Sequence, residues 1–308
     1  MNISVYITSY NKSKYLHKAI ESVLNQSYKP LEIIIVDDHS EDKSRDIIHS
    51  FYNRYPNIII PIYNEINLGI SNSRNIGLRK MKGEIVTFLD GDDYYYPKKL
   101  EYEYSLLQNS LNVQAAFSNF HYINERGEVT GRFAKENDTP ATGDIFINTY
   151  TRDYHVNSRN NYIYEMFYKK CLDKIGYYDP TITLWEDWDF RIRFSKQYHY
   201  GYCSKINSVY RKIASGIHNV DHNIQFREQI KIHIKNKSTI QDLKEKEIHH
   251  IQNRVFSKIK NLFIPTIKSY LMEKYYLKAI STCVYFIFIF KTRKSISIAL
   301  KTLLIGYK

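Results

Sequence analysis

GEIVTFLDGDD, residues 83–93, runs from apolar, strand-like residues directly into three carboxylates, Asp90, Asp92 and Asp93. Burying a carboxylate without a partner is costly, and three close together repel one another, so a positive group is expected beside them. Gly91 in this acidic turn lets the backbone approach a ligand closely, because glycine has no Cβ. The stretch therefore predicts a strand that ends in a ligand-binding turn.

Asp90-Gly91-Asp92 forms a DxD sequence, a pattern suited to a hard divalent cation. Mn²⁺ and Mg²⁺ prefer carboxylate oxygens and often share their coordination shell with substrate phosphates. Such a cation would supply the positive charge that the three carboxylates require. Asp-Gly-Asp is also a common turn, and by itself the DxD sequence leaves both interpretations open.

Strands and helices alternate along the first hundred residues. Apolar runs predict strands over residues 3–10, 31–38, 58–64 and 84–90. Helical periodicity predicts helices over residues 14–26, 44–55 and 71–81. This alternation is typical of an α/β fold, in which a mostly parallel sheet has helices on both faces.

Polar residues follow three of these strands, at the carboxyl ends where open parallel sheets bind ligands. They are Thr8 to Asn11, Asp37 and Asp38, and Asp90 to Asp93. We therefore expect an acidic pocket at that edge of the sheet. Further along, the pattern predicts a helix after Pro97, antiparallel strands within 114–133, and a helix that begins with acids near residue 186.

Positive charge is concentrated in the last third of the chain. Residues 1–200 carry 24 Lys and Arg against 26 Asp and Glu, whereas residues 201–308 carry 20 against 6. This asymmetry predicts two units with different tasks. Three scattered cysteines without metal-ligand spacing suit a reducing cytoplasm, and MNISVYITSYNKS lacks the basic and long apolar segments of a signal peptide. A cytoplasmic location is therefore expected.

Five short blocks occur in order along the chain. They are TSYN after the first strand, IIIVDDHS after the second, NLGISNSRNIGL before the fourth, DGDD at its end, and WEDWDF at residues 185–190. Together they resemble the family 2 glycosyltransferases of the GT-A fold, over about residues 1–215. The resemblance implies a GT-A, Rossmann-like domain that binds a nucleotide-sugar and catalyses transfer, followed by a basic, mainly helical region at 216–308.

The resemblance implies donor-binding roles at the first two strand ends. Thr8 and Tyr10 would line the pocket of the nucleotide base, with Tyr10 stacked on it, and Asp38 would accept a hydrogen bond from the base. The residues alone leave another role open, because Asp37 or Asp38 also suits an N-cap or Asx turn before the next helix.

At the DxD sequence the resemblance implies that Asp90 and Gly91 lie against the donor and that Asp92 binds Mn²⁺ or Mg²⁺. Asn67, Gly69 and Arg74 match the family's Asn-x-Gly and Ser-Arg-Asn pattern, which implies further donor contacts. An arginine at the start of a helix could hold phosphate oxygens in its fork. Alternatively, Arg74 only neutralises the aspartate cluster.

Glu186-Asp187 resembles the family's ED motif, which implies that Asp187 is the general base of an inverting transfer. Such a base lies opposite the leaving diphosphate and takes the proton from the attacking hydroxyl. Glu186 would shape the site, and Trp185 or Trp188 would offer a face to the acceptor sugar. Asp189 adds a second carboxylate nearby, and acids at a helix N-terminus are also explained by the helix dipole alone.

Arg211, Ser215 and His218 fall in a segment expected to be a loop. In the resembling family such a segment often folds over the donor, and a His or Arg there can contact the diphosphate or the metal. An exposed loop histidine without any such role is an equally good account of His218.

The basic C-terminal region mixes apolar stretches with lysines. Its longest apolar run, Cys283–Phe290, is shorter than the roughly 20 residues that a bilayer-spanning helix needs. Helices of this composition suit peripheral contact with an anionic membrane surface. Packing on the catalytic domain, or a homo-oligomer with solvated lysines, is equally compatible. No nucleic-acid recognition motif accompanies the charge, so no nucleic acid partner is expected.

These observations predict a metal-dependent, inverting hexosyl- or N-acetylhexosaminyltransferase. The predicted donor is a nucleotide diphosphate-sugar, with UDP indicated by the resemblance, and the acceptor is a hydroxyl of a glycan or lipid-linked glycan in bacterial surface polysaccharide synthesis. A sugar-nucleotide pyrophosphorylase is disfavoured, because TSYNKSKYL replaces the glycine-rich, basic loop of that class. The alternative from another class is a noncatalytic glycan-assembly subunit with a decayed transferase site.

Overall fold

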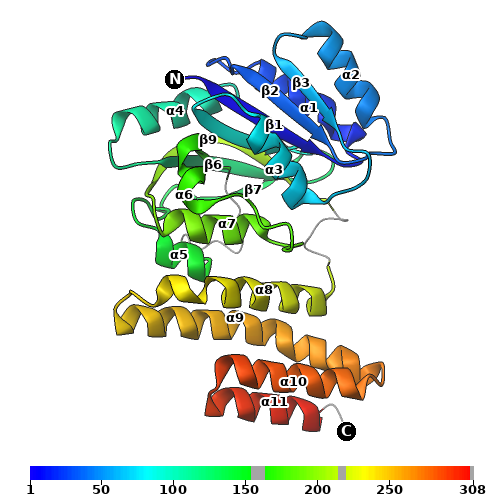
Figure 1. Ribbon diagram of the computed structural model, residues 1–308, viewed down its shortest axis with the longest axis vertical. Helices are drawn as coiled ribbons and strands as arrows, with labels where there is room; N and C mark the ends of the chain where they lie inside the picture. Colours follow the sequence, from blue (N-terminus) through cyan, green and yellow to red (C-terminus); the bar gives the residue numbers. More distant parts are fainter. Residues whose placement is uncertain (154–163, 214–219, 306–308) are drawn as a thin grey trace. The chain divides into compact units, whose positions relative to one another are not determined.

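The computed structural model describes residues 1–153, 164–213 and 220–305. The chain divides into two compact units, Met1–Ala214 and Ser215–Lys308, and each unit is described by itself (Figure 1).

The first unit is built on a sheet whose first half is parallel. Its strands are β1 (Ile3–Ser9), β2 (Glu32–Asp37), β3 (Ile59–Tyr63) and β4 (Ile85–Asp90), in the spatial order β3-β2-β1-β4. All seven residues of β1 and all six of β2 are buried, as expected for strands with helices on both faces. The carboxyl ends of β2, β1 and β4 therefore lie side by side, as the sequence predicts.

Three helices connect these strands: α1 (Ser13–Leu24), α2 (Ser44–Arg54) and α3 (Ile70–Lys80). The chain moves from β1 to β2 to β3 and then returns to β4. Right-handed connections therefore place α1 and α2 on one face of the sheet and α3 on the other. On the α3 face the backbone comes close to the sheet, since a Cβ on Gly77 would lie 3.0 Å from Tyr6.

The second half of the sheet is mixed. Beyond β4 come β8 (Met166–Tyr168), β6 (Ala115–Ile123), β9 (Tyr200–Arg211) and β5 (Tyr94–Tyr95), and β7 (Val129–Arg132) pairs with β6. β9 is parallel to β6, and the other pairings in this half are antiparallel. α4 (Lys99–Asn109) packs against β6 and β9, and α5 (Phe146–Thr151) packs against α7 (Glu186–Ser195). The short α6 spans Leu172–Ile175.

The strand β9 corrects one expectation from the sequence. Arg211, expected in a loop, is the last residue of β9 and is buried. The apolar alternation of β9 is hard to recognise because its register against β6 shifts between Ser118 and Phe120. Ser215 and His218, assigned to the same loop, lie outside the described residues.

The second unit is helical. It contains α8 (His222–Asn236), a 3₁₀ turn (Lys237–Ile240), α9 (Glu245–Met272), α10 (Tyr276–Phe290) and α11 (Arg293–Ile305). α9 packs against α8, α10 and α11, and α10 lies beside α11 (Figure 1). Stacked phenylalanines join α9 to α10, with the rings of Phe263 and Phe286 4.2 Å apart. Among the described residues, no helix has the length and hydropathy to cross a bilayer.

Candidate active site

Arg74 joins two acids that are distant in the sequence. Its Nη2 lies 3.1 Å from Asp90 Oδ1, and its Nη1 lies 3.1 Å from Glu186 Oε1. The side chain is only 3% exposed, and its guanidinium lies over the rings of Phe88 and Tyr178. A buried guanidinium between two carboxylates holds them in a fixed geometry. The DxD sequence and the Glu-Asp sequence at residues 186–187 thus belong to one site.

The turn after β4 is anchored to the end of β1. Thr8 Oγ1 donates to Asp90 Oδ1 at 3.1 Å, and the Gly91 amide donates to the carbonyl oxygen of Thr8 at 2.9 Å. A Cβ on Gly91 would lie 2.9 Å from that carbonyl oxygen, which is too close. Glycine is therefore required at this position by packing, and its backbone conformation keeps Asp90 and Asp92 beside β1.

Asp92 already has a cationic partner. The ammonium of Lys12, from the segment between β1 and α1, lies 2.5 Å from Asp92 Oδ2. Burial raises the pKa of Asp92, the Lys12 charge lowers it, and the charge of Asp90 raises it. The carboxylate is 14% exposed, so it is accessible from the pocket. Lys12 is a site residue that the sequence analysis missed.

Asp93 is buried and has a structural role. Its carboxylate accepts a hydrogen bond from the Tyr164 hydroxyl and another from the Arg211 amide at 2.5 Å. Burial, together with the charges of Asp92 and Asp90, raises its pKa well above the usual range. Arg211 Nε also donates to the carbonyl oxygen of Asp92, at 2.9 Å. Asp93 and Arg211 therefore tie the acidic turn to the end of β9.

Asp38 organises the loop before α3. Its carboxylate accepts hydrogen bonds from the amides of Leu68 at 2.9 Å and Gly69 at 2.8 Å, and from Asn64 Nδ2 at 2.7 Å. Asn67 Nδ2 donates to the backbone oxygen of Asp38 at 3.3 Å. Asp38, Asn67 and Gly69, all assigned to the donor site, are thus brought together.

The two other residues at these strand ends differ in their surroundings. Asp37 Oδ1 accepts from the Ser40 amide at 3.0 Å and from Arg45 Nε at 2.8 Å. The expectation that Asp37 or Asp38 makes the turn before α2 is wrong, because Asp42 Oδ1 accepts from the amide of Ser44, the first residue of that helix, at 2.9 Å. Tyr10 follows β1 and is 47% exposed, which leaves its ring accessible to a stacking ligand.

Asp187 lies in the first turn of α7 and is held by a buried arginine. Arg191 Nη1 donates to Asp187 Oδ2 at 2.7 Å, and Arg191 Nε donates to Glu165 at 3.0 Å. Arg191 and Glu165 are each 1% exposed, whereas the Asp187 side chain is 11% exposed. The Arg191 guanidinium therefore fixes the orientation of Asp187, which is more exposed than Glu165, its other carboxylate partner.

The neighbours of Asp187 on α7 have separate partners. Burial raises the pKa of Glu186 to about 7; Arg74 opposes that rise, and Asp187 and Asp90 add to it. Asp189, the second carboxylate noted in the sequence, accepts hydrogen bonds from Arg193 at 2.9 and 3.1 Å and is fully buried. Asp189 is thus a structural residue of the α7 helix.

The two tryptophans near Asp187 are not equivalent. Trp188 is 7% exposed, and its Nε1 donates to the carbonyl oxygen of Thr149 at 2.8 Å. Trp185 precedes α7 in a left-handed conformation, with φ of 60°, and is less buried than Trp188. The guanidinium of Arg152 lies over both rings, at 5.0 and 5.2 Å. Trp185 is therefore the better placed of the two to contact a ligand.

The pKa of Tyr210 in β9 is affected by acids from both parts of the site. Burial raises its pKa, and the charges of Asp93, Asp90, Asp92 and Asp187 raise it further. The charges of the DxD carboxylates and of Asp187 therefore both affect the pKa of this one hydroxyl. Tyr210 was not found from the sequence because β9 was not predicted.

The carboxylates at the DxD turn suit a divalent cation that is shared with a substrate. Among the described ranges, no three His, Cys, Asp or Glu side chains are arranged to hold a metal by themselves. Asp92 is nevertheless partly accessible, has Asp90 beside it and already accommodates the Lys12 ammonium. Mg²⁺ sites of this kind use one or two carboxylates together with substrate phosphates. The residues present therefore fit the expected cofactor.

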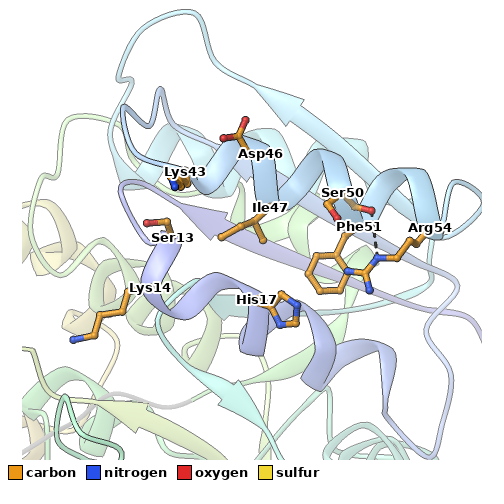
Figure 2. A pocket seen from close by; sticks show the side chains of 9 residues that line it. All are labelled: Ser13, Lys14, His17, Lys43, Asp46, Ile47, Ser50, Phe51 and Arg54. Carbon is orange, nitrogen blue, oxygen red and sulfur yellow. Dashed lines mark hydrogen bonds between the residues drawn. The ribbon is translucent and has the colours of Figure 1, made fainter.

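A separate cleft lies between α1 and α2 (Figure 2). It has a volume of about 390 Å³ and is lined by Ser13, Lys14, His17, Lys43, Asp46, Ile47, Ser50, Phe51 and Arg54. None of the predicted site residues lines it. Phe51 and Ile47 are its apolar lining residues, and Arg54 lies over the Phe51 ring at 4.2 Å (Figure 2). The acids at the strand ends and on α7 therefore lie outside this cleft.

Known proteins share much of this sequence. The family model described as Glycosyl transferase family 2 matches residues 4–215, more than two thirds of the chain. An uncharacterized glycosyltransferase of Nostoc sp. is 44% identical over 110 residues, covering 36% of this chain and 34% of that protein. The minor teichoic acid biosynthesis protein GgaA of Bacillus subtilis is 34% identical over 219 residues, covering 68% of this chain and 47% of that protein. The chain thus spans less than half the length of each of these two relatives.

Solved structures share the fold. S. aureus TarS 1–349 in complex with UDP-GlcNAc superposes with a TM-score of 0.64 at 20% identity, covering 88% of this chain and 81% of that chain. GalNAc-T7 with UDP, GalNAc and Mn²⁺ superposes with a TM-score of 0.58 at 14% identity, covering 76% of this chain and 48% of that chain. The GT-A fold expected from the sequence, with its mostly parallel sheet and C-terminal helices, is confirmed.

Proposed function

This chain belongs to glycosyl transferase family 2, and from that premise we propose that it is an inverting, metal-dependent glycosyltransferase acting on a nucleoside diphosphate-sugar. The observation that carries the proposal is the Arg74 bridge between Asp90 and Glu186. It joins a donor-side acid to the Glu-Asp pair that would serve the acceptor. A transferase needs both halves in one pocket, because donor and acceptor must meet in a defined geometry.

The donor half would bind a UDP-sugar. Tyr10 offers an exposed ring to the base, and the loop that Asp38 organises would carry Asn67 and Gly69 to the donor. The similarity in fold to TarS, which was solved with UDP-GlcNAc, supports UDP and an N-acetylhexosamine or hexose as the first candidates. Arg74 holds Asp90 in place; a direct contact between Arg74 and the diphosphate stays a prediction.

Mn²⁺ or Mg²⁺ would be held by Asp92, with Asp90 beside it. When bound, the cation would neutralise charge that develops on the departing nucleoside diphosphate. The ammonium of Lys12 pairs with Asp92, so a cation held by Asp92 would share that carboxylate with Lys12, and the ammonium would lie close to the donor phosphates. Lys12 could then stabilise the leaving group as well.

Asp187 would act as the general base. Its accessible carboxylate would take the proton of the acceptor hydroxyl while the oxygen attacks the anomeric carbon on the face opposite the diphosphate. Arg191 contributes by fixing the carboxylate orientation, and Glu165 fixes Arg191. Glu186 would shape the site through Arg74, and Trp185 would contact the acceptor sugar.

The acceptor would be a hydroxyl of a glycan or lipid-linked glycan of the bacterial surface. Similarity to GgaA, whose name refers to minor teichoic acid biosynthesis, supports a surface polymer as the product. Capsule and lipopolysaccharide are further polymers of this class. The corresponding site of action is the inner face of the cytoplasmic membrane.

Nucleotide binding tests the proposal directly. Thermal shifts would be recorded with UDP, GDP, CDP and dTDP, each with Mn²⁺ and with EDTA, on the wild type and on Asp92→Ala. We expect stabilisation by UDP with Mn²⁺ that EDTA and Asp92→Ala both abolish. No stabilisation by any nucleotide would overturn the transferase and favour the noncatalytic assembly subunit.

A further inference from the structure

One face of α10 is apolar and exposed. Leu277, Ile280, Val284 and Phe288 are 84, 50, 61 and 67% exposed. They recur at spacings of three and four residues, so they lie along one side of the helix. We call these four residues the α10 stripe.

The fold of the second unit does not depend on the α10 stripe. α10 packs through other positions, since Ala279, Cys283 and Phe286 are buried and Phe286 stacks on Phe263 of α9. The four side chains of the α10 stripe are therefore free of any role in the core of this unit. A contiguous row of exposed apolar side chains is typical of an interaction surface.

The neighbouring helix also exposes apolar residues. In α11, Ile296 and Leu300 are 43 and 53% exposed and lie one turn apart, whereas Ser295 and Ala299 are buried. Each of the two helices therefore has a packed face and an exposed apolar face.

Positive charge surrounds these apolar residues. Residues 274–308 contain seven Lys and Arg and no Asp or Glu. Lys274 is exposed just before α10 and Lys278 in its first turn. Lys291 is exposed in the turn after α10, and Arg293 and Lys294 are exposed at the start of α11. The α10 stripe thus has cations at both ends, and Glu273, directly before Lys274, is the one acid close to it in the sequence.

We propose that α10 and α11 form a docking surface for an anionic phospholipid bilayer. A helix that combines an exposed apolar stripe with flanking Lys and Arg lies in the interface plane, with the apolar side chains below the headgroups and the cations against the phosphates. Among the described residues no helix is suited to cross a bilayer, so contact from one side is the mode that this surface supports.

Charge favours a bilayer over a second copy of the chain. A symmetric dimer through the α10 stripe would place two cation-rich surfaces against each other, with no acid in residues 274–308 to neutralise them. An anionic bilayer supplies the opposite charge. If the proposed transferase function holds, docking would also bring the enzyme to lipid-linked acceptors.

Vesicle flotation tests the docking surface without any need for turnover. The full chain would be mixed with vesicles of phosphatidylcholine alone or of phosphatidylcholine with phosphatidylglycerol. We expect binding only to the anionic vesicles, with affinity that falls as salt is raised. Absence of binding to anionic vesicles at low salt would overturn the proposal.

Two variants separate the apolar from the charged contribution. Ile280→Ser/Val284→Ser/Phe288→Ser should weaken binding at least about tenfold, because it removes apolar area that the bilayer would cover on docking. Lys278→Gln/Lys291→Gln/Lys294→Gln should weaken it about a hundredfold, since each cation near the surface contributes about fivefold. Circular dichroism would check that both variants remain helical.

A matched control is Leu111→Ser/Val129→Ser, which removes exposed apolar residues of the first unit, 99 and 58% exposed, and should bind vesicles like the wild type. Equal binding by the wild type and the triple serine variant would contradict the proposal. So would light scattering that shows a dimer which the triple serine variant converts to a monomer, because the occupant would then be a second copy. UDP-induced thermal shifts on the same variants report the transferase site separately, so failure of one proposal is distinguishable from failure of the other.

Discussion

Arg191 and Asp187 are one helical turn apart on α7, and Arg191 Nη1 lies 2.7 Å from Asp187 Oδ2. The same guanidinium binds Glu165, which precedes β8 and is 1% exposed. Asp187, the proposed base, is therefore oriented by a buried ion pair between Arg191 and Glu165, and its own carboxylate is only partly exposed. This arrangement leaves the Asp187 carboxylate partly exposed while the Arg191 guanidinium that holds it stays buried.

Replacing Arg191 should destabilise the protein strongly. Arg191→Met would leave the carboxylates of Glu165 and Asp187 without their cation, and breaking a buried pair costs about 3–5 kcal/mol. Urea unfolding monitored by circular dichroism would measure the loss. Glu165→Gln/Arg191→Met should recover part of it, because one of the two buried charges is removed as well. A loss below about 1 kcal/mol for the single variant would show that the pair is not needed for folding.

Glu186 and Glu103 should each contribute a loss of stability as the pH rises from 4.5 to 7. Burial raises the pKa of Glu186 and that of Glu103 from 4.5 to about 7. In this window the unfolded chain has released protons that the folded chain still binds, so the favourable contribution present below pH 4.5 is lost by pH 7. Each group contributes a slope of at most about 1.4 kcal/mol per pH unit.

Glu186→Gln tests this origin of the pH dependence. The glutamine does not titrate, so the slope of unfolding free energy against pH should become shallower, with the contribution of Glu103 remaining. Urea unfolding at several pH values would measure both slopes. An unchanged slope in Glu186→Gln would mean that Glu186 ionises in the folded chain as readily as in the unfolded one.

A single methyl group should disturb the acidic turn. The Cβ of Gly91→Ala would lie 2.9 Å from the backbone oxygen of Thr8, so the turn must shift, at a cost of about 1–3 kcal/mol. Because Asp90 and Asp92 flank this residue, UDP binding with Mn²⁺ should weaken about tenfold, equivalent to about 1.4 kcal/mol. Gly131→Ala in β7 is a matched control, since its Cβ would meet nothing closer than 3.9 Å. Equal thermal stability and UDP affinity in the two variants would contradict this account of Gly91.

Much of the fold could be predicted because its first half is locally encoded. The strands β1, β2 and β4 are rich in apolar residues and almost fully buried, and polar residues follow each of them, so the binding edge could be predicted from the sequence. The family assignment made from the five short blocks is confirmed. β9 was missed because its bulged pairing with β6 breaks the alternation on which strand prediction depends.

The residues of the site could be predicted only in part from the sequence, for a different reason. The partners of the acids are side chains with no local signature, such as Lys12, which is 80 residues from Asp92. Glu165 is 26 residues from Arg191, and nothing in the sequence pairs them. The spacing of Asp187 and Arg191 was a usable signal, because acids and bases four residues apart on a helix form ion pairs.

The two tryptophans should respond differently to substitution. Trp188→Phe removes the hydrogen bond to the carbonyl oxygen of Thr149, so it should cost about 1 kcal/mol of stability while the acceptor KM stays the same. Trp185→Ala should raise the acceptor KM about tenfold, because an aromatic face for the sugar is lost. Steady-state kinetics and urea unfolding on both variants would test this. A raised KM in Trp188→Phe with unchanged stability would reverse the assignment.

The most direct test of the account is the release of UDP from UDP-GlcNAc in the presence of Mn²⁺, measured for the wild type, Asp187→Asn and Asp189→Asn. We predict turnover by the wild type and a fall of about 10²–10⁴-fold in Asp187→Asn with unchanged UDP affinity. Asp189→Asn carries the same chemical change two residues away, where the carboxylate binds Arg193, and should keep its turnover at lower stability. Equal turnover in the wild type and Asp187→Asn, or UDP binding by the wild type without any turnover of sugar donors, would contradict the proposed base and the transferase that depends on it.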